Sequence, residues 1–117
     1  MKRNPKQVFC PPTVRIFGRT YRFVDEVGNG LGQDRLGSCD SINHVITRDL
    51  AQHELEFVDT TLHEVLHGIC STMRLGTDLA TEEKFVGALA TGLIGVFQDN
   101  PEFARWLIEQ RPQKGDE

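Results

Sequence analysis

The segment His63-Glu64-Val65-Leu66-His67 constrains this chain of 117 residues more than any other feature. Two histidines four residues apart lie on one face of a helix, one turn apart, so their imidazoles can converge on one metal ion. Zn²⁺ suits such a pair, because it binds neutral imidazole nitrogen and keeps an open position for water in catalytic sites. Glu64 points to the side of the pair, where a carboxylate can act on that water as a general base. The segment therefore predicts a zinc site on a helix, with Glu64 as the catalytic residue.

Composition and charge exclude several classes of partner. The formal net charge is −4 and the Lys and Arg residues are scattered, whereas nucleic-acid binding needs a basic face, so we expect no nucleic-acid partner. No apolar run approaches the roughly 18 residues of a membrane span, and residues 1–13 lack the apolar core of a signal peptide. We therefore expect no membrane partner and a cytoplasmic location. The oligomeric state is not readable from the sequence.

Three cysteines, Cys10, Cys39 and Cys70, are odd in number and far apart. This spacing is typical of reduced thiols in a reducing compartment and not of a disulfide framework. Cys70 follows His67 by about one turn on the same helix face, where a buried free thiol is the ordinary case.

The N-terminal half of the chain is rich in strand and turn signals. Alternating apolar residues predict a hairpin formed by residues 13–17 and 21–24, with Tyr21 in the core. Residues 27–37 contain several glycines and predict a long loop, which is the segment we expect to border a specificity pocket. Residues 39–47 predict one further strand, with Ile42 as part of its apolar content and His44 as a half-exposed strand residue.

The C-terminal half has helical periodicity. Apolar residues recur at spacings of three and four from Glu54, which predicts a helix ending near Leu75 with Gly76 as its stop. Thr81 predicts the N-cap of a second helix that runs to about Gln98. Asn100 and Pro101 predict the start of a third helix, as its cap and its first position.

Together these elements predict one α+β domain over residues 13–110, between a flexible leader (1–12) and a polar tail (111–117). We expect a small, mainly antiparallel sheet of about three strands, with three helices packed behind it. The strand that ends near Thr47 is expected to offer an edge along which an extended substrate aligns by β-addition.

A catalytic zinc site commonly has three protein ligands, and two neighbouring acids are candidates for the third. Glu82 and Glu83 lie in the first turn of the second predicted helix, where acids also complement the helix dipole. Glu83 shares a stripe with Gly87 and Ala90, and such small residues let this helix approach the histidine helix closely. We therefore favour Glu83, with Glu82 as the alternative.

The pattern of His63 to His67, the acids Glu82 and Glu83, and the segment 98–101 resembles the minimal gluzincins, and more closely small phage-encoded metallopeptidases. The resemblance implies a zincin-like fold, a peptide or protein substrate, and the host cytoplasm if the chain is phage-encoded. It also implies Zn²⁺ held by His63, His67 and Glu83, with Glu64 as base and proton shuttle. Several gluzincins orient a histidine with an acid or amide four residues after the ligand glutamate.

In this chain that position is Gly87, so the group that orients the histidines is not identified by the resemblance. Asp59, one turn before His63, is a possible substitute, although a solvated acid is the simpler interpretation.

Two other interpretations compete with a metallopeptidase. The segment Gly37-Ser38-Cys39 resembles the upstream motif of peptide deformylases, which use the cysteine as third ligand, but their N-terminal glycine- and alanine-rich motif is absent. Alternatively, the chain is a non-hydrolytic zinc-binding or regulatory interaction protein. The intact Glu64 argues against this interpretation, because a structural zinc site has no need of it.

Overall fold

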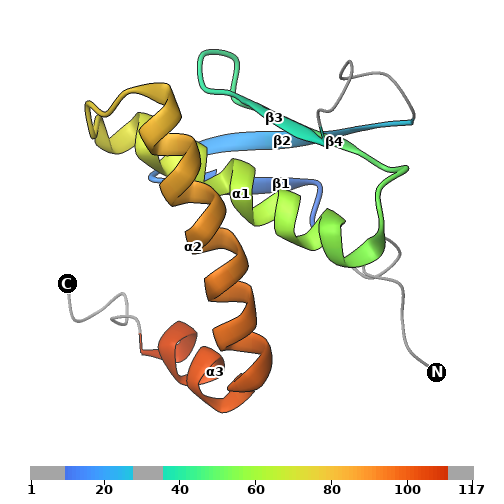
Figure 1. The fold of residues 1–117 in the computed structure, drawn as a ribbon, viewed down its shortest axis with the longest axis vertical. Coiled ribbons are helices and arrows are strands. Elements are labelled where there is room, and N and C mark those ends of the chain that lie inside the picture. The colour runs from blue at the N-terminus through green and yellow to red at the C-terminus, as the bar shows by residue number, and fades with distance from the viewer. Residues whose placement is uncertain (1–9, 28–35, 111–117) are drawn as a thin grey trace.

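The computed structural model describes residues 10–27 and 36–110 of the chain. It has an α+β fold with one four-stranded mixed sheet and three helices (Figure 1). In chain order the elements are β1 (Thr13–Ile16), β2 (Arg19–Glu26), β3 (Gly37–Asp40), β4 (Val45–Asp49), α1 (Glu54–Met73), α2 (Leu79–Asp99) and α3 (Pro101–Glu109).

The predicted hairpin is confirmed as β1 and β2. The strands pair antiparallel with Val14 opposite Tyr21, and the connecting residues Phe17 and Gly18 have positive φ angles of 50° and 83°. Two positive φ angles are what a two-residue hairpin turn of the right twist requires. Tyr21 lies in the core with Ile16 and Ile46, as expected for the only tyrosine.

The prediction of a single strand over residues 39–47 is wrong, because a turn divides this segment into β3 and β4. The Asp40 carboxylate accepts hydrogen bonds from the backbone N–H groups of Ile42 and Asn43, both at 3.0 Å. Such an Asx turn offers the backbone an alternative to the strand. Ile42 is consequently 88% exposed, and His44 lies in the turn with a φ angle of 57°.

The strand order is β1-β2-β4-β3, with β2 and β4 parallel and the two outer pairs antiparallel. The sheet is therefore mixed and has four strands, where about three mainly antiparallel strands were expected. Since β4 lies inside the sheet, the predicted edge near Thr47 is wrong, and the edge strand on this side is β3.

Helix α1 lies across one face of the sheet (Figure 1). Gly68 faces the sheet, and a Cβ atom at this position would lie 2.7 Å from Ile16 Cδ1, so the terminal methyl group of Ile16 would have to shift. The helix ends at Met73, two residues earlier than expected. Arg74 caps the helix in the left-handed conformation at a φ angle of 51°. The expected stop, Gly76, lies two residues after Arg74 in the sequence.

Helix α2 packs on α1 through the buried residues Val86 and Ala90. It begins at Leu79, before the predicted cap Thr81, because the side chain of Asp78 accepts the Thr81 N–H at 2.8 Å. Helix α3 begins at Pro101 as predicted and packs on α2, away from the sheet (Figure 1). The expectation that three helices lie behind the sheet is therefore wrong, since only α1 covers it. Within the described ranges no helix is long and apolar enough to cross a membrane.

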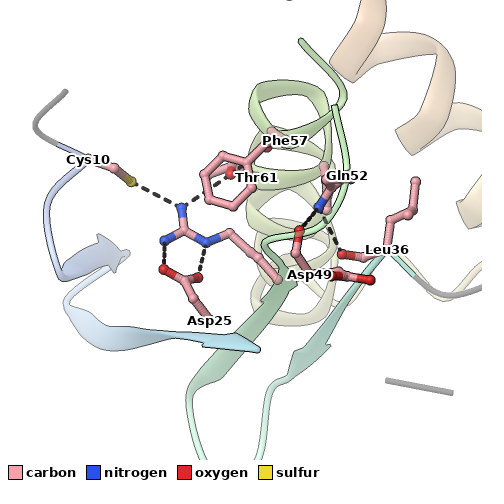
Figure 2. A network of polar contacts seen from close by, with 9 residues as sticks. Cys10, Asp25, Leu36, Asp49, Gln52, Phe57 and Thr61 are labelled. Atoms are coloured by element: carbon pink, nitrogen blue, oxygen red, sulfur yellow. Dashed lines mark hydrogen bonds and ion pairs between the residues drawn. The ribbon is translucent and has the colours of Figure 1, made fainter. Parts of the chain in front are cut away.

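A buried arginine, Arg48, joins the sheet to α1 (Figure 2). Its Nε and Nη2 atoms donate to the Asp25 carboxylate at 2.7 and 2.9 Å, and Nη1 donates to Cys10 Sγ at 3.0 Å and Thr61 Oγ1 at 3.3 Å. The guanidinium also lies 4.5 Å from the ring centroid of Phe57. Bidentate pairing with the Asp25 carboxylate gives the contact between β4 and β2 a defined geometry. The contacts of the same guanidinium with Thr61 and Phe57 link these strands to α1.

Gln52 forms a second polar link beside the first (Figure 2). Its Nε2 atom donates to the carbonyl oxygens of Leu36 at 3.2 Å and Asp49 at 2.7 Å, and its Oε1 atom accepts from Thr60 Oγ1 at 2.7 Å. This side chain therefore holds the residue before β3 against α1.

Candidate metal centre

A cleft of about 880 Å³ has α1 as its floor and β3 and α2 as its walls. His63, Glu64 and His67 lie on the floor, and Glu82 and Glu83 lie on the α2 wall. Leu36 and Gly37, at the end of the predicted glycine-rich loop, border the cleft as expected, whereas residues 28–35 of that loop lie outside the described residues.

His63, His67 and Glu83 converge at one point of this cleft. One ligand atom from each residue lies within 4.8 Å of the others. The Glu83 Oε1 atom lies 3.1 Å from His67 Nε2 and also contacts His63 Nε2. Two imidazole nitrogens and one carboxylate oxygen are a donor set that catalytic zinc sites use, so these three residues could hold Zn²⁺.

Glu82, the alternative ligand in the sequence analysis, contacts the opposite side of His67. Its Oε2 atom lies 2.5 Å from His67 Nδ1, while the Nε2 atom of the same ring faces Glu83. A histidine that donates from Nδ1 to a carboxylate keeps its Nε2 lone pair for a metal. Glu82 thus contacts His67 on the side away from Glu83 and can fix the orientation of its ring, whereas the sequence pattern offered it only as an alternative ligand. Its only sequence signal was adjacency to Glu83.

The charges of these groups depend on one another. Burial lowers the pKa of His67, but hydrogen bonds to Glu82 and Glu83 outweigh burial, and the net pKa lies above the ordinary value of 6.5. Burial raises the pKa of Glu83, but its hydrogen bonds with His67 and His63 hold the net pKa below the ordinary value of 4.5. In the metal-free protein, protonated histidine and ionised glutamate therefore stabilise each other.

Glu64 lies under the backbone of β3 and is only 7% exposed. A Cβ atom at Gly37 would lie 3.1 Å from Glu64 Cγ and 2.6 Å from Thr60 Cγ2. Only glycine therefore lets the edge strand come this close to the helix. The sequence pattern places Gly37 in the loop and in a short cysteine motif, and it contains no signal for this packing role.

Cys39 lines the same cleft but is not part of the converging group of His63, His67 and Glu83. Burial raises the pKa of its thiol to about 11, and the nearby charge of Glu64 acts in the same direction. The thiol is therefore neutral near pH 7 in the metal-free protein. All three cysteines are free.

Asp59 links two helices and is not the group that orients a histidine. Its Oδ2 atom accepts a hydrogen bond from Thr91 Oγ1 at 2.9 Å, which ties α1 to α2 beside the cleft.

Comparison of the chain with protein-family models, with curated proteins and with solved structures finds no match. The chemistry of the site is therefore inferred from its own residues. These are the converging group His63, His67 and Glu83, the acid Glu82 that contacts His67, and the buried Glu64.

Proposed function

We propose that this chain is a small zinc-dependent metallopeptidase of the minimal gluzincin type, with a zincin-like arrangement of strand, histidine helix and glutamate helix. One observation carries the proposal: His63, His67 and Glu83 converge within 4.8 Å at a cleft whose floor also contains the buried Glu64. A hydrolase needs a base beside its metal ligands, and Glu64 directly follows His63 on the same helix.

In the proposed mechanism His63, His67 and Glu83 hold Zn²⁺, and Glu82 fixes the ring of His67 through Nδ1. When bound in such a site, zinc acidifies a water molecule and polarises a carbonyl group. Glu64 takes the proton from the attacking water and delivers it to the leaving amine. The low exposure of Glu64 keeps this proton transfer away from bulk solvent.

The proposed substrate is a peptide or protein segment in extended conformation. The edge strand β3 contributes Gly37, Ser38 and Cys39 to the wall of the cleft. An edge strand can pair its backbone N–H and C=O groups with an added strand. A peptide aligned on β3 would therefore lie along the histidines on the cleft floor, which is the role that the sequence analysis had assigned to the segment near Thr47.

The test combines metal content with hydrolysis. We expect purified protein to bind one zinc per chain and to cleave members of a mixed peptide library, with products identified by mass spectrometry. Glu64→Gln should retain zinc and lose roughly 10²–10⁴-fold in rate, because the base is gone and the ligands remain. Glu54→Gln makes the same change on the same helix outside the cleft and should leave the rate unchanged.

Two results would contradict the proposal. If the purified protein contains no stoichiometric zinc, the proposed metal site is wrong. If the Glu64→Gln variant cleaves peptides as fast as the parent protein, the assignment of Glu64 as the base is wrong. If zinc binds and no hydrolysis occurs, the chain is instead the non-hydrolytic zinc-binding protein of the competing interpretation.

A further inference from the structure

Helix α2 carries an apolar seam on the side that faces away from the cleft. Phe85, Leu89, Gly92 and Val96 follow one another at spacings of four, three and four residues, which places them on one helix face. Phe85 is 62% exposed and Leu89 is 51% exposed. This spacing is typical of a helix that packs along a second helix, yet the residues that pack against α1, Val86 and Ala90, lie on another face.

Two glycines of α2 have no packing role within the described part of the chain. A Cβ atom at Gly92 or Gly95 would meet nothing within 4 Å. By contrast, Cβ atoms at Gly37 and Gly68 would meet neighbours at 2.6 and 2.7 Å, so those glycines permit close contacts. Glycine weakens a helix interior, and here no close approach compensates for it. A second helix crossing at Gly92 would supply that approach.

Helix α3 packs on α2 and carries further exposed apolar residues. Phe103, Trp106 and Leu107 are each about half exposed, and the rings of Phe103 and Trp106 stack at a centroid distance of 6.2 Å. At about 200 Å² per residue, the exposed fractions of these three and of Phe85, Leu89 and Val96 leave roughly 600 Å² accessible. A stable interface takes at least about 600 Å² from each partner.

We propose that this α2–α3 surface is a homodimer interface, with a two-fold axis close to Gly92. The surface is self-complementary: Leu89 lies three residues before Gly92 and Val96 lies four residues after it. An antiparallel crossing at Gly92 sets Leu89 of each protomer against Val96 of the other, which is the arrangement that a two-fold axis requires. The cleft lies on the opposite side of α2 and stays open.

The tail that follows α3 in the sequence is polar. Residues 111–117, which follow α3, contain no large apolar side chain. A second copy supplies an apolar surface of equal size, so the seam, the open space at Gly92 and the exposed residues of α3 are accounted for by one partner.

Sedimentation equilibrium on the full chain tests the proposal. We expect twice the mass of the chain at about 100 µM. Gly92→Gln adds a side chain into open space in the protomer, so the helix content by circular dichroism should be kept, while the dimer dissociation constant rises at least tenfold. Trp106→Ala should weaken the dimer in the same direction. Ala80→Gln adds the same side chain at an exposed position off the seam, and it should leave the dimer unchanged.

A monomer at that concentration would overturn the proposal. So would a dimer whose dissociation constant is unaffected by both Gly92→Gln and Trp106→Ala. Neither outcome depends on zinc or on hydrolysis, so failure of the dimer and failure of the proposed enzyme are distinguishable.

Discussion

At the scale of single residues, the site depends on how two consecutive acids use one imidazole ring. Glu82 contacts His67 Nδ1 and Glu83 contacts His67 Nε2, so the neighbours in sequence act on opposite sides of the ring. Consecutive residues point about 100° apart on a helix, and both can reach His67 only because α2 crosses α1 at this turn. The sequence pattern indicated that an acid from this turn contributes to the site, but it presented the two acids as alternatives.

Removing the orienting acid should weaken zinc binding without abolishing it. We expect Glu82→Gln to lower zinc affinity about 10–100-fold, because the amide no longer fixes the tautomer of His67 as a carboxylate does. Glu83→Gln should lower it further, since a ligand is lost. Competition with a chromophoric chelator measures both affinities. If Glu82→Gln lowers zinc affinity more than Glu83→Gln does, then Glu82 is the ligand and Glu83 the orienting acid.

The pKa shifts predict how pH affects the metal-free protein. The pKa of His67 is raised, so its contribution to stability is fully present below the ordinary value of 6.5 and is lost as pH rises through the folded-state value. The pKa of Glu83 is lowered, so its contribution is present above the ordinary value of 4.5 and is lost as pH falls through the folded-state value. In the metal-free protein, His67 and Glu83 therefore stabilise the fold most between the two ordinary values, 4.5 and 6.5.

Zinc held by the proposed ligands would reverse this dependence, because zinc binds neutral imidazole. We expect the increase in melting temperature on adding zinc to grow from about pH 6 to about pH 8. Differential scanning fluorimetry across this range, with chelator-treated protein as reference, measures both trends. An increase that is independent of pH, or that shrinks towards pH 8, would contradict the assignment of His67 as a ligand.

At the scale of elements, the edge strand β3 and helix α1 build the cleft together. Gly37 lets the strand approach Thr60 and Glu64 closely, and Gln52 fixes the Thr60 hydroxyl in place. The sequence pattern predicted α1 well, since apolar periodicity is a local property. It merged β3 with β4, because the apolar residues around Asp40 and Asn43 continued a strand pattern that the Asx turn interrupts.

Substituting Gly37 should damage both stability and activity. A Cβ atom would lie 2.6 Å from Thr60 Cγ2, so we expect Gly37→Ala to lower the free energy of unfolding by about 1–3 kcal/mol and to displace β3 from Glu64. Urea unfolding measures the first effect and peptide hydrolysis the second.

The double variant Gly37→Ala/Thr60→Ser provides the control. Serine removes the Cγ2 methyl group that the new Cβ atom meets and keeps the hydroxyl that bonds to Gln52. It should recover part of the lost stability. No recovery would mean that the close approach of β3 to α1 is not the cause of the loss.

At the scale of the whole molecule, the fold is a series of layers with few buried apolar side chains. The described core consists of Ile16, Tyr21 and Ile46 between sheet and α1, with Phe57 nearby, and Val86 with Ala90 between the helices. Such a small core leaves modest stability, and a metal that joins α1 to α2 should add to it appreciably.

We expect zinc at about one hundred times its dissociation constant to raise the melting temperature by about 10 °C, since ligand binding at that excess contributes about 2.7 kcal/mol. Chelator should reverse the increase, and magnesium, which prefers six oxygen ligands, should not reproduce it. Equal shifts with zinc and magnesium would contradict a site made of two histidines and one glutamate.

The elements that depend on local interactions can be predicted from the sequence. The hairpin follows from alternation and a two-residue turn, the three helices follow from periodicity, and the pairing of His63 with His67 follows from their spacing of four. Each of these involves residues within a few positions of one another, whose relative geometry the backbone alone sets.

Contacts between residues far apart in the chain could not be predicted from the sequence. The parallel pairing of β2 with β4, the edge position of β3, and the separate contacts of Glu82 and Glu83 with His67 all join segments far apart in the chain. Their geometry depends on how helix and sheet surfaces pack, down to the absence of a Cβ atom at Gly37 and Gly68. No local pattern contains that information, because it is a property of two surfaces in contact.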